Sequence, residues 1–307
     1  MKIVFMGTPD FSVPCLKALA ENGYDIPAVF TQPDKPKGRG YKMIPPPVKK
    51  CAEEYNIPVF QPLSLRKGED AEKSLKTLEE IAPDLIIVVA YGQILPKEIL
   101  ELPRLGCINI HASLLPEYRG AAPIQRSILD GKTKTGVTSM MMSEGLDTGD
   151  MLIKRETQIG EDETSAELTD RLSEIGAELL LETVKAAEEG TLKPEKQDDS
   201  LSCYAKMITK DMSALDFSKP AQVVHNTIRG VTGFTMMGGK RLKVYKSTLC
   251  GSVSGEAGTI ADPNEFIVVC GDGNGVKFLE VQAEGGKRMN TGDFLRGRKL
   301  EKGQMLG

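Results

Sequence analysis

Residues 85–90 of this 307-residue chain read LIIVVA, an unbroken run of aliphatic and mostly β-branched side chains. A half-exposed strand alternates apolar and polar residues, whereas a strand buried on both faces does not. The run therefore predicts a central strand of a parallel sheet that helices cover on both sides.

Strand and helix signals alternate on either side of this run. We expect further strands at residues 2–6, 26–30, 107–110, 137–142 and 151–156. Apolar residues from Leu168 to Val184 recur at helical spacing and predict one amphipathic helix over residues 165–189. This order predicts an α/β fold with an open, mainly parallel sheet in residues 1–189. Residues 31–47 hold five prolines and two glycines, and we expect no regular structure there.

The character of the sequence changes near residue 190. Residues 190–208 begin with a polar, turn-rich stretch and are expected to form a linker. In residues 209–307, one helix near 219–230 precedes short extended segments that are rich in glycine. That pattern is typical of a small β-barrel, and the OB type is our expectation.

The composition excludes several classes of protein. The longest apolar run, Leu85–Tyr91, is too short to cross a membrane, and the N-terminus lacks the features of a signal peptide, so we expect a cytoplasmic protein that needs no membrane. Six cysteines without a CxxC pair, together with only two histidines, predict neither disulfides nor a metal site. Residues 209–307 hold 14 Lys and Arg against 10 Asp and Glu, although the whole chain carries −4. This basic third favours a polyanionic partner.

Polar side chains that can carry chemistry lie at the ends of two predicted strands. Asn109 and His111 are two residues apart on one strand, so that they share a face, and Asp147 lies on the glycine-bracketed loop after another strand. Ligands of open α/β sheets bind at such strand ends. We therefore take these three residues as the candidate catalytic set, although a structural histidine and a turn aspartate would fit the same pattern.

These residue types suit transfer of an acyl group from an amide to an amine. The Asn109 amide can donate to the developing oxyanion, and His111 can accept a proton near neutral pH. Asp147 can orient the imidazole or favour its charged form. No Ser or Cys nucleophile is needed, because the amine itself attacks.

Two long motifs surround these residues, NIHASLLPEYRGAAPIQRSIL at 109–129 and TGVTSMMMSEGLDTGDML at 135–152. Through them, and through VFMGTPDFSVPCLKAL at 4–19 and GDFLRGRKLEKGQMLG at 292–307, the chain resembles the folate-dependent formyltransferases. It is most similar to those members that act on initiator methionyl-tRNA. The resemblance spans essentially the whole chain.

The resemblance implies a Rossmann-like formyltransferase domain, a linker and an OB-like C-terminal domain. It places the family's catalytic residues on Asn109, His111 and Asp147, and folate contacts on Ser113, Leu114, Leu115 and Pro116. The donor would be 10-formyltetrahydrofolate. The acceptor would be the methionine amino group of initiator methionyl-tRNA, and the formylated product would serve translation initiation. We expect a monomer that uses no metal.

Two basic segments are candidates for tRNA binding. Residues 34–49 match a family insertion that reaches toward the acceptor stem, with Lys35, Lys37, Arg39 and Lys42 in it. The C-terminal domain offers Lys240, Arg241 and Lys243. The family's aromatic, proline-containing segment after the C-terminal helix is replaced here by IRGVTGF, a departure that bears on this surface.

Two alternatives remain open on the residues alone. The same chemistry could serve a small amine, such as glycinamide ribonucleotide or an amino sugar, although a small acceptor needs neither basic segment. A nucleotide-binding oxidoreductase has only Gly7 in its favour, because FMGTPDF lacks the GxGxxG spacing.

Overall fold

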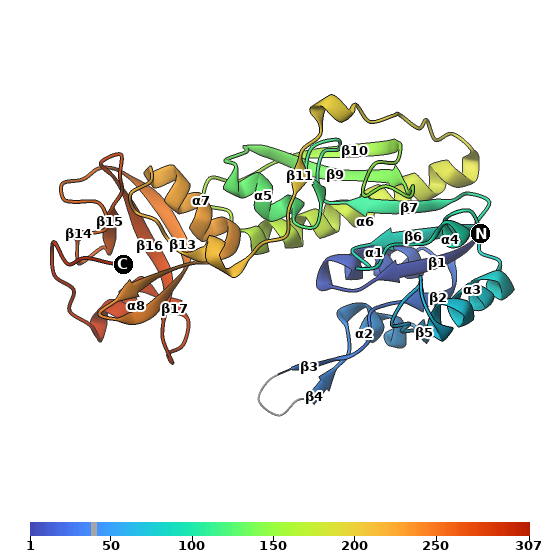
Figure 1. Cartoon of the computed structure of the whole chain (residues 1–307), viewed down its shortest axis with the longest axis horizontal. Helices are drawn as coiled ribbons and strands as arrows, with labels where there is room; N and C mark the ends of the chain where they lie inside the picture. The colour runs from blue at the N-terminus through green and yellow to red at the C-terminus, as the bar shows by residue number, and fades with distance from the viewer. Residues whose placement is uncertain (38–41) are drawn as a thin grey trace. The chain divides into compact units, whose positions relative to one another are not determined.

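The computed structural model describes residues 1–37 and 42–307, which divide into two compact units that interleave along the chain (Figure 1). Unit 1 comprises residues 1–120, 136–157 and 169–204. Unit 2 comprises residues 121–135, 158–168 and 205–307. The chain therefore passes between the units several times.

A seven-stranded sheet forms the centre of unit 1, in the order β10-β9-β7-β6-β1-β2-β5. Its strands are β1 (Lys2–Gly7), β2 (Asp25–Phe30), β5 (Val59–Phe60), β6 (Leu85–Val89), β7 (Cys107–His111), β9 (Lys134–Met141) and β10 (Met151–Gln158). The pairs from β5 through to β7 are parallel, whereas β7 and β9 are antiparallel. Every residue of β6 is buried, which confirms the prediction of a mainly parallel sheet around this strand.

Helices cover both faces of this sheet, as the sequence pattern predicts. They are η1 (Asp10–Ser12), α1 (Val13–Glu21), α2 (Pro47–Glu54), α3 (Glu69–Ile81), α4 (Lys97–Leu100) and α6 (Ser165–Glu189). The long helix α6 approaches the sheet closely, since a Cβ on Gly176 would lie 3.3 Å from Ile110 and 3.8 Å from Val137. A glycine at this position lets α6 lie against β7 and β9.

The proline-rich stretch is more ordered than expected. Strands β3 (Lys35–Lys37) and β4 (Lys42–Ile44) form an antiparallel two-stranded ribbon, so the prediction of no regular structure over residues 31–47 is wrong. Pro36 pairs with Met43 within this ribbon. A proline removes one donor, which a two-stranded ribbon tolerates far better than the middle of a sheet.

Unit 2 contains the expected antiparallel β structure. Its strands are β12 (Gly233–Met237), β13 (Lys240–Ser252), β14 (Ile260–Asp262), β15 (Ile267–Val269), β16 (Asn274–Ala283) and β17 (Met289–Asn290). They are ordered β12-β13-β16-β15-β14, with β17 beside β16. The C-terminus bonds to both edges of this sheet, through Ile260 to Gln304 on one side and Gly307 to Met236 on the other. These bonds curl the sheet around its apolar core.

The remaining helices and short strands connect these layers. They are β8 (Arg119–Gly120), α5 (Pro123–Leu129), η2 (Asp199–Leu201), β11 (Tyr204–Ala205), η3 (Lys210–Ser213), α7 (Ala221–Val231) and α8 (Thr291–Arg296). Helix α7 packs against the two segments of unit 2 that come earlier in the chain, residues 121–135 and 158–168. Leu129 of α5 lies within 3.2 Å of where a Cβ on Gly230 would stand, and buried His225 and Arg229 bond the carbonyls of Glu161 and Gly160.

The cysteines are all unpaired. Burial raises the pKa of the Cys107 thiol to about 12, so that this thiol stays protonated and behaves as an apolar core residue. In the part of the chain that the structure describes, no helix is both long and apolar enough to cross a membrane.

Candidate functional site

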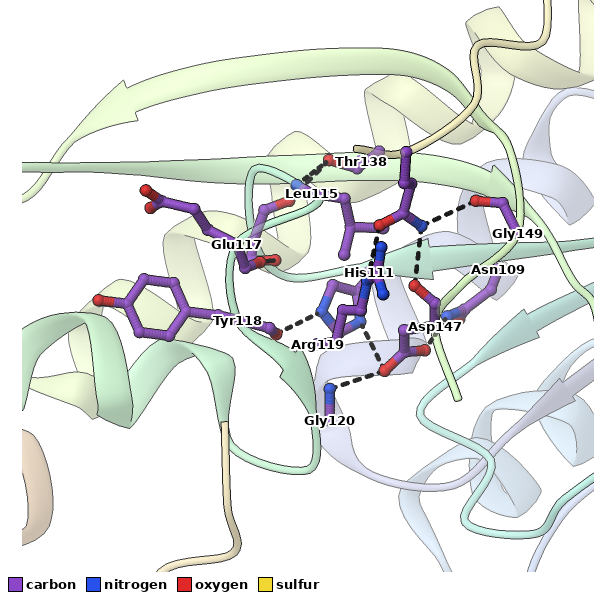
Figure 2. A network of polar contacts seen from close by, with 12 residues as sticks. Asn109, His111, Leu115, Glu117, Tyr118, Arg119, Gly120, Thr138, Asp147 and Gly149 are labelled. Atoms are coloured by element: carbon purple, nitrogen blue, oxygen red, sulfur yellow. Dashed lines mark hydrogen bonds and ion pairs between the residues drawn. The ribbon is translucent and has the colours of Figure 1, made fainter. Parts of the chain in front are cut away.

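The structure brings Asn109, His111 and Asp147 together within unit 1 (Figure 2). The Asn109 side-chain amide donates to Asp147 Oδ1 over 3.5 Å. His111 Nδ1 lies 3.8 Å from Asp147 Oδ2. The convergence that the strand ends predict is therefore present, with the histidine and the carboxylate largely shielded from solvent.

Strand geometry explains why these residues meet. Asn109 and His111 share one face of β7, and β9 runs antiparallel beside β7 with Met140 opposite Asn109. The loop after β9 folds back tightly onto the end of that strand. A Cβ on Gly149 would lie only 1.8 Å from the Met141 carbonyl oxygen, so the chain can pass this closely only with glycine there. A glycine at position 149 is thus required for Asp147 to reach the β7 side chains.

Asp147 is held in an uncommon backbone conformation, with φ of +52°. Aspartate is one of the few non-glycine residues that tolerate the left-handed region, and such residues concentrate at functional sites. The Gly120 amide donates to Asp147 Oδ2 over 2.8 Å. The position of the carboxylate is therefore set by its own loop and by the segment after β7.

The His111 ring is fixed by a main-chain contact. Its Nε2 lies 2.9 Å from the Tyr118 carbonyl oxygen, which can only accept, so Nε2 carries the proton. In the neutral ring this leaves Nδ1 as the basic nitrogen, on the side of Asp147.

The four residues expected to contact folate form a turn directly after β7. Thr138 on β9 fixes this turn, because its hydroxyl donates to the Ser113 carbonyl and accepts from the Leu115 amide. The side chains of Ser113 and Leu115 are buried, whereas those of Leu114 and Pro116 are partly exposed. A ligand at this turn would therefore meet its main chain and the Leu114 and Pro116 side chains.

Sequence reasoning missed four residues that shape the site. Tyr118 and Gly120 act through main-chain groups, which no side-chain pattern reveals. The Gln197 side chain donates to the Asp147 and Gly149 carbonyls, and the Arg119 guanidinium donates to Gln197. The sequence EYRG inside the quoted motif is the one available signal for Arg119. Gln197 lies in a segment that composition marks as a linker.

A metal site would need a cluster of suitable ligands. Within residues 1–37 and 42–307, no group of three or more His, Cys, Asp and Glu side chains is arranged to hold a metal ion.

Three of the N-terminal basic candidates, Lys35, Lys37 and Lys42, lie on the β3–β4 ribbon. Lys35 and Lys42 are exposed, and Lys37 pairs with Lys42 along the backbone. Arg39 lies outside the described residues. At the base of the ribbon, Lys49 binds Asp34 at 3.0 Å, and hydrogen bonds from Gln61 and Lys49 lower the pKa of Asp34.

The C-terminal basic candidates lie at the start of β13. Lys240, Arg241 and Lys243 are all exposed, and the Arg241 guanidinium stacks over the Phe234 ring at 4.0 Å. Further along β13, Tyr245 lies under the guanidinium of Arg288 at 4.3 Å, and Arg288 is itself paired with Glu280. The face therefore combines cations with aromatic rings, a combination that suits nucleic-acid phosphates and bases. The sequence pattern did not identify its aromatic members.

Family models match both halves of the chain. A formyl transferase model matches residues 1–184, and a formyl transferase C-terminal domain model matches residues 207–299. The chain belongs to the formyl transferase family. The resemblance quoted from the sequence motifs is thereby confirmed.

Relatives of this formyl transferase match over its full length. A methionyl-tRNA formyltransferase of Geotalea uraniireducens is 49% identical over 311 residues, covering all of this chain and 98% of the relative. One of Alkaliphilus oremlandii is 48% identical, with all of both chains covered.

Solved structures share the fold of this formyl transferase at lower identity. The Helicobacter canadensis N-formyltransferase, in complex with folinic acid and dTDP-3-aminofucose, matches with a TM-score of 0.68 and 19% identity over 91% of this chain and 98% of that one. Glycinamide ribonucleotide transformylase 1 of Symbiobacterium toebii matches with a TM-score of 0.53 and 17% identity over 64% and 94%.

Proposed function

We propose that this formyl transferase moves the formyl group of 10-formyltetrahydrofolate to the methionine amino group of initiator methionyl-tRNA. The observation that carries the proposal is full-length similarity, near 50% identity, to proteins named for this reaction. The convergence of Asn109, His111 and Asp147 supplies the chemistry. The product would be N-formylmethionyl-tRNA for translation initiation.

The three residues divide the work as follows. The Asn109 amide is partly exposed, and its contact to Asp147 among the described residues is long, so a donor is available for the formyl oxygen on which negative charge develops. His111 Nδ1 accepts the proton that the attacking amine loses as its new C–N bond forms. The old bond between the formyl carbon and the folate nitrogen then breaks, and His111 returns the proton to that nitrogen. Asp147 stabilises the imidazolium between these two steps.

The donor would bind along the turn after β7. The partly exposed Leu114 and Pro116 side chains and the main chain of residues 113–116 are available to the folate. Because Thr138 already bonds both sides of this turn, little ordering is needed on binding.

Exposed positive charge also supports the assignment of tRNA as the acceptor. Exposed Lys35, Lys42, Lys240, Arg241 and Lys243 present cations that a small amine would not need. Phosphate neutralisation by such residues makes binding strong and salt-dependent. We propose that Lys37 and Arg39 also contribute to tRNA binding.

The test is transfer of radiolabelled formyl from 10-formyltetrahydrofolate to charged initiator tRNA. We expect acid-precipitable label that depends on the enzyme and on aminoacylation of the tRNA. Parallel reactions should contain glycinamide ribonucleotide and a nucleotide-linked amino sugar as acceptors. Efficient transfer to either one, without transfer to tRNA, would instead support the small-amine alternative.

A further inference from the structure

Gln197 lies in the segment that the sequence pattern predicts as a linker, but its side chain bonds directly to the loop that carries Asp147. Its Nε2 donates to the carbonyl oxygens of Asp147 and Gly149, each over 2.8 Å. These carbonyls flank the turn that gives Asp147 its left-handed conformation. One side-chain amide therefore clasps the loop on both sides of Thr148.

The orientation of this amide follows from its partners. Arg119 Nε donates to Gln197 Oε1 over 2.9 Å, and a guanidinium can only donate. The carbonyl end of Gln197 must then face Arg119, which leaves its two N–H donors for the loop carbonyls. Arg119 is itself anchored, because its Nη2 binds Asp199 Oδ1 at 2.8 Å.

The backbone around Gln197 is also fixed. Glu195 and Met151 exchange two main-chain hydrogen bonds of 2.8 Å, which hold the segment beside the first residue of β10. Asp147 is thus tied to Arg119 and Gly120 twice, once through Gln197 and once through the Gly120 amide on its carboxylate. Figure 2 shows Arg119, Gly120 and Gly149 around the Asp147 loop.

We infer that Gln197, supported by Arg119, is a positioning residue that holds the Asp147 carboxylate at His111 during formyl transfer. The inference rests on the proposed function, since it assigns Gln197 to the reaction at that same site. Without the two hydrogen bonds from Gln197, which we call the clasp, the loop can relax from its left-handed turn. Displacement of a catalytic group by about 1 Å costs on the order of 10²-fold in rate.

Two variants test the clasp. Gln197→Ala removes both donors, and Gln197→Glu keeps the shape but sets a group that only accepts against two carbonyl oxygens. We expect kcat for formylation to fall about 10- to 100-fold in both, with the KM values for folate and tRNA unchanged. Glu195→Gln is the matched control, because the Glu195 side chain is exposed and its bonds to Met151 are made by the main chain.

A double-mutant cycle separates positioning from general destabilisation. If Gln197 acts through Asp147, then Gln197→Ala should have little further effect on kcat in an Asp147→Asn background. Full additivity of the two substitutions would overturn the inference.

Hydrogen exchange of the loop gives a readout that needs no acceptor. Amides of residues 144–150 should exchange faster in both Gln197 variants than in wild type or Glu195→Gln. Unchanged exchange together with unchanged kcat overturns the role of Gln197. Failure of the wild-type enzyme to formylate charged tRNA would count against the proposed function instead, whatever the exchange result.

Discussion

His111 Nε2 donates a 2.9 Å hydrogen bond to the carbonyl oxygen of Tyr118. The bond fixes the ring and assigns the proton to Nε2, so the nitrogen that faces Asp147 at 3.8 Å is the one able to act as a base. The main chain of the motif, as well as its side chains, therefore determines which nitrogen is available to accept a proton in the proposed reaction.

Replacing His111 tests this assignment. His111→Ala should lower kcat by roughly 10²–10⁴, the range for loss of general acid–base catalysis. His111→Gln should be equally impaired, because its amide can still donate to Tyr118 but offers no basic nitrogen. Steady-state formylation kinetics measure the effect, and circular dichroism checks that folding is spared. A near wild-type kcat in His111→Gln would remove the histidine from the role of base.

Asn109 is expected to act on the formyl oxygen. Asn109→Ala should reduce kcat by about 10²–10³, as for removal of one oxyanion donor. Asn109→Asp should be at least as damaging, because it sets a second carboxylate where the amide now lies 3.5 Å from Asp147. The measurement is single-turnover formyl transfer at saturating folate and tRNA. Similar single-turnover rates for Asn109→Ala and wild type would contradict the assignment.

The exposed cations of β13 should govern tRNA affinity. Arg241→Ala and Lys243→Ala should each weaken tRNA binding at low salt and reduce the slope of log Kd against log salt by about 1. Folate affinity should not change. Lys277→Ala is the matched control on the same sheet, because Lys277 is already paired with Glu265. An equal loss of slope in the control would show that only net charge matters.

Glu167 provides a pH-dependent contribution to stability within unit 2. Hydrogen bonds from Lys246 and then from the Thr164 amide lower its pKa from 4.5 to about 2. Thr164 and Glu167 also form a reciprocal cap at the start of α6, since each side chain accepts from the other's amide. The lowered pKa means that this stabilisation is complete above about pH 4.5 and is lost as the pH falls toward 2.

Removing this carboxylate should therefore have a larger effect at neutral pH. Glu167→Ala should reduce the free energy of unfolding by about 1 kcal/mol at pH 7, a value that allows for solvent screening of the half-exposed pair. The difference from wild type in urea titrations should shrink between pH 4.5 and pH 3. Glu167→Gln, which can still cap the helix, should reduce the free energy of unfolding by less than Glu167→Ala does. A difference that stays constant over this range would exclude the charge as its source.

The sequence predicts most of what lies on regular elements. LIIVVA identifies the buried strand β6, and the two-residue spacing on β7 places Asn109 and His111 on one face. Asp147 is expected beside them from a rule for the carboxyl ends of parallel strands, but β9 runs antiparallel to β7 and its Met141 lies opposite Ile108. The loop that folds back after β9 is what brings Asp147 to the β7 side chains.

What the sequence pattern misses depends on contacts between distant residues. Gln197 is 50 positions from Asp147 and lies in a polar stretch without periodicity, so nothing local marks its two bonds. The β3–β4 ribbon was missed for a different reason. Prolines argue against strands in general, but a ribbon of two strands leaves room for one missing donor.

The interleaving of the two units limits how this protein can be divided or recombined. His225 and Arg229 bind carbonyls of residues 160–161, and α5 packs on α7, so the C-terminal unit includes pieces encoded before residue 170. A chain cut at residue 208 would leave these earlier pieces without helix α7, whose side chains bind their backbone carbonyls. An exchange of unit 2 between relatives would therefore have to replace three separate segments of the chain, with five junctions between the units.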